Sequence, residues 1–258
     1  MTASPTLPLS EQAPAGQALP EWMTDEEARK VLSFLRDQDY LACSLMYGSG
    51  LRRREVVSLR LGNFNLAEGS ITVRAGKGDK DRVTCLPVAL RDDVTLQIQR
   101  ATSIHAQDHV RNHPAIFVPP EVERKYPTAG LELRNFWFFP AKGLSRDPRS
   151  GIVRRHHIHE DSLAKQLRPA ASHAGILRKV NCHAFRHSFA TQFLLNGGTL
   201  HELKELLGHA SIQTTEVYLH CLPRLGARIT SPLDVRSEPS KIVQLPLEPF
   251  REQEIGRA

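Results

Sequence analysis

The 258-residue sequence lacks the features that mark several classes of protein. Its apolar runs are much shorter than the roughly 20 residues that a membrane-spanning helix needs, so no membrane partner is expected. Its four cysteines lie far apart without a C-x-x-C pair, and no basic-then-apolar leader opens the chain, so neither a disulfide framework nor secretion is indicated. We therefore expect a cytoplasmic protein.

The sequence also lacks the motifs of nucleotide and metal chemistry. It contains no G-x-x-x-x-G-K-[ST] phosphate loop, and HELKE at residues 201–205 fails the zinc pattern H-E-x-x-H at its fifth position. The run HHIH at residues 156–159 has no cysteine or carboxylate cluster at a spacing that would complete a metal site, and we interpret it as basic surface. No metal and no other cofactor are expected.

The composition is that of a folded protein with a moderate excess of positive charge. Hydrophobic residues make up 40% of the chain and charged residues 24%, which excludes disorder, collagen and coiled coil as the main class. The 34 Lys and Arg exceed the 28 Asp and Glu, giving a formal charge of +6. This excess favours a polyanionic partner only slightly, because many basic proteins bind none.

Apolar periodicity predicts a mixed α+β fold that is mainly α-helical. Capping boxes at Thr24 with Glu27 and at Thr199 with Glu202 each predict the start of a helix. The helices are expected near residues 24–35, 40–47, 51–61, 90–105, from 158 with a kink or early end at Pro169, 183–195, 200–207 and 211–220. Two β-prone runs, 70–75 and 82–87, flank a charged loop that contains glycine and predict a small antiparallel hairpin.

The stretch from about 108 to 156 has little apolar periodicity, and we interpret it as an insertion. It holds six of the 16 aromatic residues, namely Phe117, Tyr126, Phe136, Trp137, Phe138 and Phe139. So many rings need burial, either within their own domain or against a partner.

Several cationic and imidazole groups stand at turns and helix starts. They are Arg52, Lys77, His183, Arg186 and His209, and Tyr218 follows nine residues after the last of them. Each alone is explained as a solvated charge or a helix cap. Together they suit a phosphodiester, whose five-coordinate transition state needs its oxygens neutralised and its leaving alkoxide protonated. Tyrosine can be the nucleophile when cations stabilise its phenolate.

Four sequence blocks carry a family resemblance. YGSGLRRREVVSLR, GKGDKDR, HAFRHSFAT and LLGHASIQTTEVYLH resemble, in this order and at the family's spacing, the catalytic domain of the tyrosine recombinases. The resemblance implies that Arg52 and Arg186 clamp the scissile phosphate, while Tyr218 attacks it. It also implies that Lys77 protonates the departing 5′ oxygen.

Three further roles follow from the same resemblance. His183 would act as an acid or base, His209 would hydrogen-bond a phosphate oxygen, and Glu55 would support the first arginine. The implied product is a 3′-phosphotyrosyl link, which conserves bond energy and makes ATP and metal unnecessary.

The insertion is similar to one subgroup of this family. VERKYPTAG followed by DPRSGIVRRHH resembles the extra segment of integron integrases, and ITSPLDV is similar to their C-terminal end; the resemblance runs from roughly Leu19 to Val235. It implies two DNA partners, double-stranded attI-like sites and folded single-stranded attC-like sites, and a homotetrameric synapse on DNA. In that subgroup the segment helps to recognise extruded bases and contacts neighbouring protomers.

Seven residues are predicted to contact DNA on this basis. They are Lys80, Arg82, Tyr126, Trp137, Arg154, Arg155 and His156. Aromatic rings suit this task because every unstacked base offers a π face. The alternative is that the rings close a small hydrophobic core under a long loop.

These patterns predict three segments of chain. Residues 1–22 are predicted to be a disordered Pro-rich arm, and residues 236–258 a flexible tail. Residues 23–235 are predicted to form a recombinase catalytic domain, with the insertion at about 108–156. The arm is too short to form the helical core-binding domain that completes the family's clamp around DNA, so we expect that domain to be missing.

Two hypotheses for the function remain open. The first is an integron integrase-like recombinase that integrates and excises gene cassettes in the bacterial cytoplasm, associated with the nucleoid when bound to DNA. The second is a truncated DNA-binding or assembly protein that keeps the fold but no longer recombines. A type IB topoisomerase uses similar groups, but the insertion argues against it.

Overall fold

A computed structural model describes residues 22–74 and 81–219, which are mainly helical. Its α-helices are α1 (Asp25–Ser33), α2 (Asp37–Ser49), α3 (Arg53–Val57), α4 (Arg91–Val110), α5 (Pro120–Lys125), α6 (Glu160–His173), α7 (Cys182–Leu195), α8 (Leu200–Leu207) and α9 (Gln213–Glu216). Short 3₁₀ turns are η1 (Leu61–Asn63), η2 (Val88–Leu90), η3 (Ala129–Leu131) and η4 (Leu133–Asn135). The strands are β1 (Phe64–Asn65), β2 (Ser70–Val73), β3 (Arg82–Cys85), β4 (Pro140–Arg146) and β5 (Val153–His157). The predicted mixed, mainly helical class is confirmed.

The predictions for the arm, the tail and the tip of the hairpin lie outside the described residues. Lys77 and Lys80 are among the residues not described. Within the described ranges, no helix is both long and apolar enough to span a membrane.

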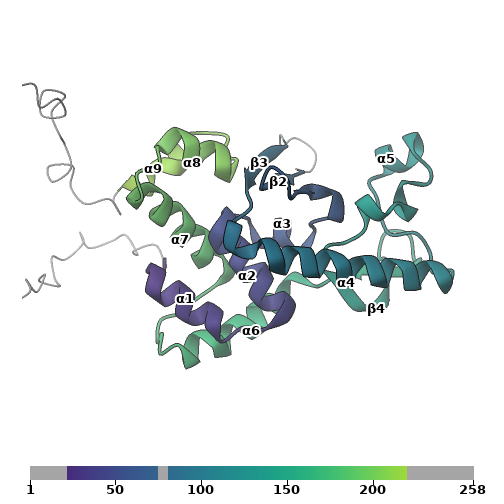
Figure 1. The fold of residues 1–258 in the computed structure, drawn as a ribbon, viewed down its shortest axis with the longest axis horizontal. Coiled ribbons are helices and arrows are strands. Elements are labelled where there is room, and N and C mark those ends of the chain that lie inside the picture. The colour runs from purple at the N-terminus through teal and green to yellow at the C-terminus, as the bar shows by residue number, and fades with distance from the viewer. Residues whose placement is uncertain (1–21, 75–80, 220–258) are drawn as a thin grey trace, which may run out of the picture. The chain divides into compact units, whose positions relative to one another are not determined.

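Helices α1, α2, α6 and α7 pack around one hydrophobic core (Figure 1). The capping box of α1 is confirmed, because the Thr24 side chain accepts the Glu27 N–H and the Glu27 carboxylate accepts the Thr24 N–H. Ala28, Val31 and Leu32 then lie buried on one face, as their spacing predicts. A smaller cluster forms where α7 meets α8: Phe189, Ala190, Leu194, Leu203, Leu207 and Tyr218.

The helix predicted over residues 51–61 is too long, because α3 ends at Val57. The Leu59 carbonyl accepts a hydrogen bond from the Phe138 N–H at 2.8 Å, and the Leu61 N–H donates to the Phe136 carbonyl at 3.0 Å. These residues therefore pair with a distant segment instead of continuing the helix.

The predicted hairpin is confirmed by β2 and β3, which pair antiparallel with Ile71 opposite Thr84. Ile71 and Val73 alternate with less buried residues, as expected for a strand with one face on the core. The short strand β1 pairs with the other edge of β2 and was not predicted from the sequence.

The expected early end of the helix at Pro169 is wrong, because α6 continues through it to His173. Proline removes one helical N–H, and the carbonyl left without this donor is that of Lys165. Lys165 and Pro169 are both exposed, so water can serve that carbonyl while Leu163 and Leu167 remain buried. Toward the C-terminus, the capping box of α8 is confirmed, whereas the helix predicted over 211–220 is reduced to α9 within the described part.

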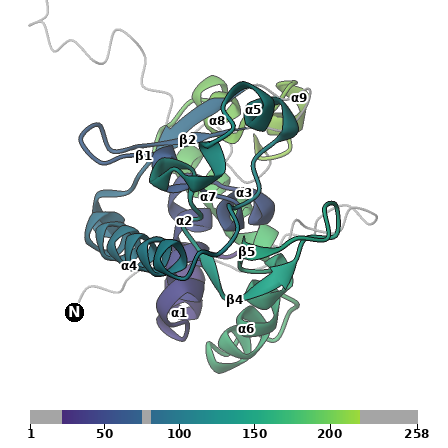
Figure 2. The same cartoon turned by 90° about the vertical axis from the view of Figure 1, so that its right-hand side faces the viewer.

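The segment at about 108–156 contributes a row of rings to the main hydrophobic core. Phe136, Trp137, Phe138 and Phe139 are all 4% exposed or less, so these four rings are core residues; the core they join is the main one around α1, α2, α6 and α7, not a small separate core under a loop. Tyr126 differs, with 53% of its surface exposed. Figure 2 views this segment from its outer end, with α5 above and the β4–β5 hairpin below.

A buried ion pair fastens the β4–β5 hairpin to α4. Arg155 on β5 donates from Nε and Nη2 to the two carboxylate oxygens of Asp108, at 2.5 and 2.6 Å. Its Nη1 donates to the carbonyls of Ala141 and Lys142 on β4. Since both charged side chains are nearly buried, each depends on the other for its stability there.

We predict that Asp108→Ala lowers the free energy of unfolding by about 3 kcal/mol, because it leaves the Arg155 guanidinium buried without its counter-charge. Urea denaturation followed by circular dichroism measures this. Glu132→Ala is the matched control, since Glu132 pairs with Arg134 at the surface of the same segment and should contribute less than about 1 kcal/mol. Equal losses in the two variants would contradict the prediction.

Candidate active site

A single carboxylate, that of Glu55 on α3, gathers three guanidinium groups. It accepts the backbone N–H of Arg52 at 2.7 Å and its Nη1 at 2.9 Å. Arg82 on β3 donates Nη1 and Nη2 to the two carboxylate oxygens at 2.8 and 2.7 Å. Nη1 of Arg186 on α7 lies 3.9 Å from Oε2. Three elements that are distant in the sequence therefore meet at Glu55.

The arginines keep Glu55 ionised although it is largely buried. Burial by itself would raise the pKa of this carboxyl group. The hydrogen bonds and charge of Arg82, the N–H of Arg52 and the charge of Arg186 outweigh burial and lower the pKa to about 2. Sequence reasoning linked Glu55 to Arg52 but missed Arg82 as its partner, because that contact spans 27 residues.

Arg186 is held from inside the protein. It is 5% exposed, and its Nη1 donates to the Gly50 carbonyl at 2.5 Å while Nη2 donates to the Leu207 carbonyl at 2.7 Å. Burial and the charge of Arg52 lower its pKa to about 10, so it stays charged at neutral pH. Gly50 has a φ of +66°, and a Cβ there would meet Phe189 at 2.6 Å. Only glycine therefore fits the turn that presents this carbonyl.

His209 lies beside Arg186, directly after the left-handed Gly208 that ends α8. Its Nε2 is 3.2 Å from Nη2 of Arg186, and because a guanidinium only donates, Nε2 is the acceptor. The Nδ1–H then donates to Oγ1 of the buried Thr215 at 3.0 Å. Burial and the charges of Arg186, Arg52 and Arg82 lower the pKa of His209 to about 4, so the imidazole is neutral at pH 7.

Tyr218 is 4% exposed, with its ring in the small cluster between α7 and α8. Its hydroxyl oxygen lies 2.8 Å from Nδ1 of His187. Sequence reasoning missed His187: it stands in HAFRH next to Arg186, but nothing in the spacing distinguished it from a histidine on a helix surface.

The structure brings together five of the six residues predicted to be catalytic. Arg52, Arg186, His209 and Tyr218 come together as described above, and His183 lies one turn before Arg186 on α7. Burial and the charges of Arg53, Arg186 and Arg52 lower the pKa of His183. The sixth, Lys77, lies outside the described residues. In the described part, no group of three or more His, Cys, Asp or Glu side chains is arranged to hold a metal ion.

The arginines predicted to contact DNA are engaged within the fold. Arg82 also donates Nε to the Leu206 carbonyl at 3.0 Å, in addition to its bonds with Glu55. Arg154 lies 3.3 Å from the buried Asp147, and Arg155 forms the ion pair with Asp108. Their contact with DNA stays a prediction.

The other predicted DNA contacts fall into two groups. Trp137 is 4% exposed, donates Nε1 to the Arg155 carbonyl at 3.2 Å and stacks under the Arg60 guanidinium at 4.1 Å. Tyr126 lies at the surface, whereas His156 is partly buried beside Trp137. Lys80 is not among the described residues. These contacts too remain predictions.

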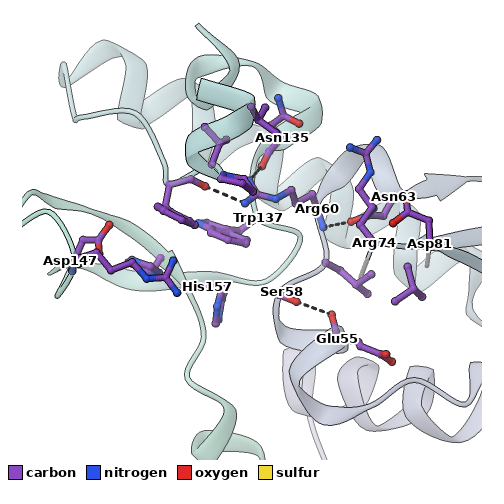
Figure 3. A pocket seen from close by; sticks show the side chains of 18 of the residues that line it. Glu55, Ser58, Arg60, Asn63, Arg74, Asp81, Asn135, Trp137, Asp147 and His157 are labelled. Atoms are coloured by element: carbon purple, nitrogen blue, oxygen red, sulfur yellow. Dashed lines mark hydrogen bonds between the residues drawn. The ribbon is translucent and has the colours of Figure 1, made fainter. Parts of the chain in front are cut away.

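A cavity of about 550 Å³ separates α3 and the β2–β3 hairpin from the segment at 108–156 (Figure 3). Its wall includes Arg60, Arg74, Trp137, Arg149, His156 and His157. Arg60 donates to the carbonyls of Asn135 and Phe117, and burial together with the charge of Arg74 lowers its pKa to about 10. Cations and aromatic rings therefore line part of the cavity, and the carboxylates of Glu55, Asp81 and Asp147 are also in its wall.

Structural comparison defines the class of this fold. The crystal structure of XerA recombinase matches 83% of this chain and 64% of its own, with a TM-score of 0.56 and 23% identity. A mainly helical fold with small antiparallel sheets is therefore shared with this recombinase.

Sequence comparison then identifies the family. The model of the phage integrase family matches residues 21–224, so the chain belongs to this family of tyrosine recombinases. It is 38% identical over 216 residues to an "Integrase/recombinase" of Escherichia coli, covering 84% of this chain and 64% of that protein. It is 30% identical over 205 residues to tyrosine recombinase XerA of Pyrococcus furiosus, covering 78% and 58%. The chain thus spans less than two thirds of these relatives.

We predict that Glu55→Gln lowers the free energy of unfolding at pH 7 by roughly 3 kcal/mol, because the ionised carboxylate stabilises the three arginines. The folded-state pKa of about 2 lies below the ordinary 4.5, so this contribution is complete above about pH 4.5 and is lost as the pH falls toward 2. Urea denaturation at a series of pH values should therefore show the gap between wild type and variant closing over this range.

Glu26→Gln, at an exposed position in the first turn of α1, is the control for loss of a surface carboxylate. A gap between wild type and Glu55→Gln that stays constant from pH 7 to pH 2 would contradict the assigned role.

Proposed function

We propose that this chain is the catalytic part of a site-specific DNA recombinase, which cleaves and rejoins strands through a 3′-phosphotyrosyl intermediate. The observation that carries the proposal is the convergence of Arg52 and Arg186 at Glu55, with His209 beside Arg186 and Tyr218 on the adjoining segment. Tyr218 is linked to this group through His187, which contacts its hydroxyl oxygen at 2.8 Å and follows Arg186 directly on α7.

In the proposed reaction, Arg52 and Arg186 neutralise the non-bridging oxygens of the scissile phosphate. Each well-placed donor of this kind contributes about 10²- to 10³-fold in rate. His209 hydrogen-bonds a phosphate oxygen from its place beside Arg186. The Tyr218 oxygen attacks phosphorus, the 5′ oxygen leaves, and Lys77 supplies its proton. The covalent link conserves the energy of the phosphodiester for rejoining.

DNA is the proposed partner. A solved structure of XerH site-specific recombinase, bound to a palindromic difH substrate in a post-cleavage complex, is 25% identical with a TM-score of 0.51. It matches 81% of this chain and 52% of its own length. We extend the proposal to a homotetrameric synapse that joins attI-type and attC-type sites and moves gene cassettes, as in the integron integrases that the segment at 108–156 resembles.

The cavity beside this segment supports recognition of an extruded base. Its volume of about 550 Å³ is large enough for a nucleobase, and Figure 3 shows Trp137, Arg60 and His157 converging on it. Aromatic and guanidinium faces bind unstacked bases, and Arg74 adds positive charge for the adjoining phosphate. A folded single-stranded site with extrahelical bases is therefore the proposed substrate.

We predict that the 258-residue chain forms a denaturation-resistant adduct with a nicked suicide substrate, and that Tyr218→Phe abolishes it. Phenylalanine keeps the buried ring but lacks the attacking oxygen. Denaturing electrophoresis detects the adduct, and filter binding should show DNA affinity within about threefold of wild type. Tyr40→Phe, which removes a hydroxyl on α2, should leave the adduct unchanged. DNA binding by wild type without an adduct on any hairpin or duplex would instead favour a protein that keeps the fold and only binds DNA.

For the cavity, we predict that His157→Ala weakens binding to a hairpin with extrahelical bases about tenfold more than binding to its fully paired counterpart, since each stacked base contributes about 1–3 kcal/mol. Fluorescence anisotropy on both hairpins measures the two affinities. His173→Ala, at an exposed position on α6, is the control. Equal losses on the two hairpins would contradict base recognition. His157 is preferred to Trp137 as the site of mutation because the Trp137 ring is buried.

A further inference from the structure

A second histidine of α7, His187, contacts the proposed nucleophile directly. Its Nδ1 lies 2.8 Å from the Tyr218 hydroxyl oxygen, and the two rings are tilted by 48° with their centroids 5.6 Å apart. Tyr218 is almost fully buried, and its N–H donates to the Thr215 carbonyl at 3.1 Å. The phenol is therefore held in place with its hydroxyl at an imidazole nitrogen.

The surroundings of His187 keep this imidazole neutral. Burial, together with His183 and Arg186 on the same helix, lowers its pKa below the ordinary 6.5. His209 at the end of α8 is a further titratable neighbour, and its own low pKa leaves it uncharged at pH 7. A neutral imidazole has one free acceptor nitrogen, and 2.8 Å is a suitable distance for a proton transfer from the phenol.

We propose that His187 accepts the proton that Tyr218 loses when it attacks the scissile phosphate; this inference rests on the recombinase function proposed above. The Tyr218 O–H bond breaks and its proton passes to Nδ1 of His187. The bond from the phenolic oxygen to phosphorus forms, and the bond from phosphorus to the 5′ oxygen breaks. That oxygen takes its proton from a separate donor. On rejoining, the 5′ hydroxyl returns its proton to that separate donor as it attacks phosphorus, the bond from phosphorus to the phenolic oxygen breaks, and His187 returns its proton to the departing phenolate.

The charge balance of the site suits this transfer. An imidazolium beside Arg186 would be unfavourable in the empty site, where burial and positive charge oppose it. The proposed substrate brings a phosphate, whose negative charge grows on the non-bridging oxygens as the phenolate attacks. His187 therefore becomes positively charged at the stage when the negative charge on the phosphate oxygens stabilises the imidazolium.

Two substitutions separate proton transfer from simple positioning. In His187→Asn the amide can occupy the place of Nδ1 and hydrogen-bond the phenol, but it cannot accept the proton. His187→Ala removes both functions. We expect both variants to form the adduct at least about 10²-fold more slowly than wild type in single-turnover assays, with unchanged DNA affinity. His173→Asn should match wild type, because His173 lies exposed at the end of α6.

Two further measurements test the assignment of the proton acceptor. They are the pH dependence of the adduct-forming rate and the rate on a substrate with a changed leaving group. Wild type should lose adduct-forming rate as acidic pH protonates His187, whereas both His187 variants should lack this acidic limb and His183→Asn should retain it. A substrate with sulfur in place of the bridging 5′ oxygen needs no protonated leaving group. This substrate should restore the adduct-forming rate of Lys77→Ala, whereas the His187 variants should remain slow on it.

The outcomes distinguish the inference from the function on which it rests. An adduct formed by wild type, together with near-normal rates for His187→Asn and slow rates for His187→Ala, would reduce His187 to a positioning residue and overturn the inference alone. Normal rates for both variants would overturn it as well. Absence of an adduct from wild type on every substrate would overturn the proposed function together with the inference.

Discussion

The negative charge of Glu55 is the constraint on which the site depends. Arg52, Arg82 and Arg186 repel one another, and their approach is stable because a single ionised carboxylate lies among them. The bidentate contact with Arg82 also joins α3 to β3, and the Arg82 Nε bond to the Leu206 carbonyl continues this link to α8. One acidic side chain thus fixes the mutual positions of the elements that carry the proposed phosphate-binding groups.

The arginines in this cluster differ in what they leave available to a ligand. Arg186 is satisfied by the carbonyls of Gly50 and Leu207 and is almost fully buried. Arg52 keeps 37% of its side chain exposed while Glu55 holds its backbone N–H and one guanidinium nitrogen. A phosphate would therefore approach from the side of Arg52, with Arg186 beneath it. Arg186 is the more buried of the two arginines, and its hydrogen bonds to two backbone carbonyls offset the cost of its desolvation.

Features that depend on neighbouring residues could be predicted from the sequence. The capping boxes at Thr24 and Thr199, the β2–β3 hairpin and the helix that carries His183 and Arg186 each follow from spacing within a few residues. The predicted catalytic set depended on the resemblance of four sequence blocks to a known family, and the structure describes five of its six members.

Features that depend on distant contacts could not be predicted. The helix after Arg52 ends early because Leu59 and Leu61 bond to the backbone of the run at 136–138. Arg82 and Arg155 are charged residues in strands, and the sequence alone does not show that buried carboxylates on other elements bind them. Similarly, the contact between His187 and Tyr218 crosses 31 positions and depends on how α7 meets the C-terminal part of the described chain.

The buried place of Arg186 has a consequence for the evolution of such proteins. Its bonds join the turn at Gly50 to the end of α8, so a lineage that no longer rearranged DNA would still need this arginine in order to fold. The Tyr218 ring fills the cluster between α7 and α8, and its hydroxyl oxygen lies 2.8 Å from Nδ1 of His187. Phenylalanine at this position would keep the ring and lose one hydrogen bond, whereas loss of Arg186 would remove two bonds between distant parts of the chain. The fold alone therefore explains the presence of Arg186, whatever reaction the protein catalyses.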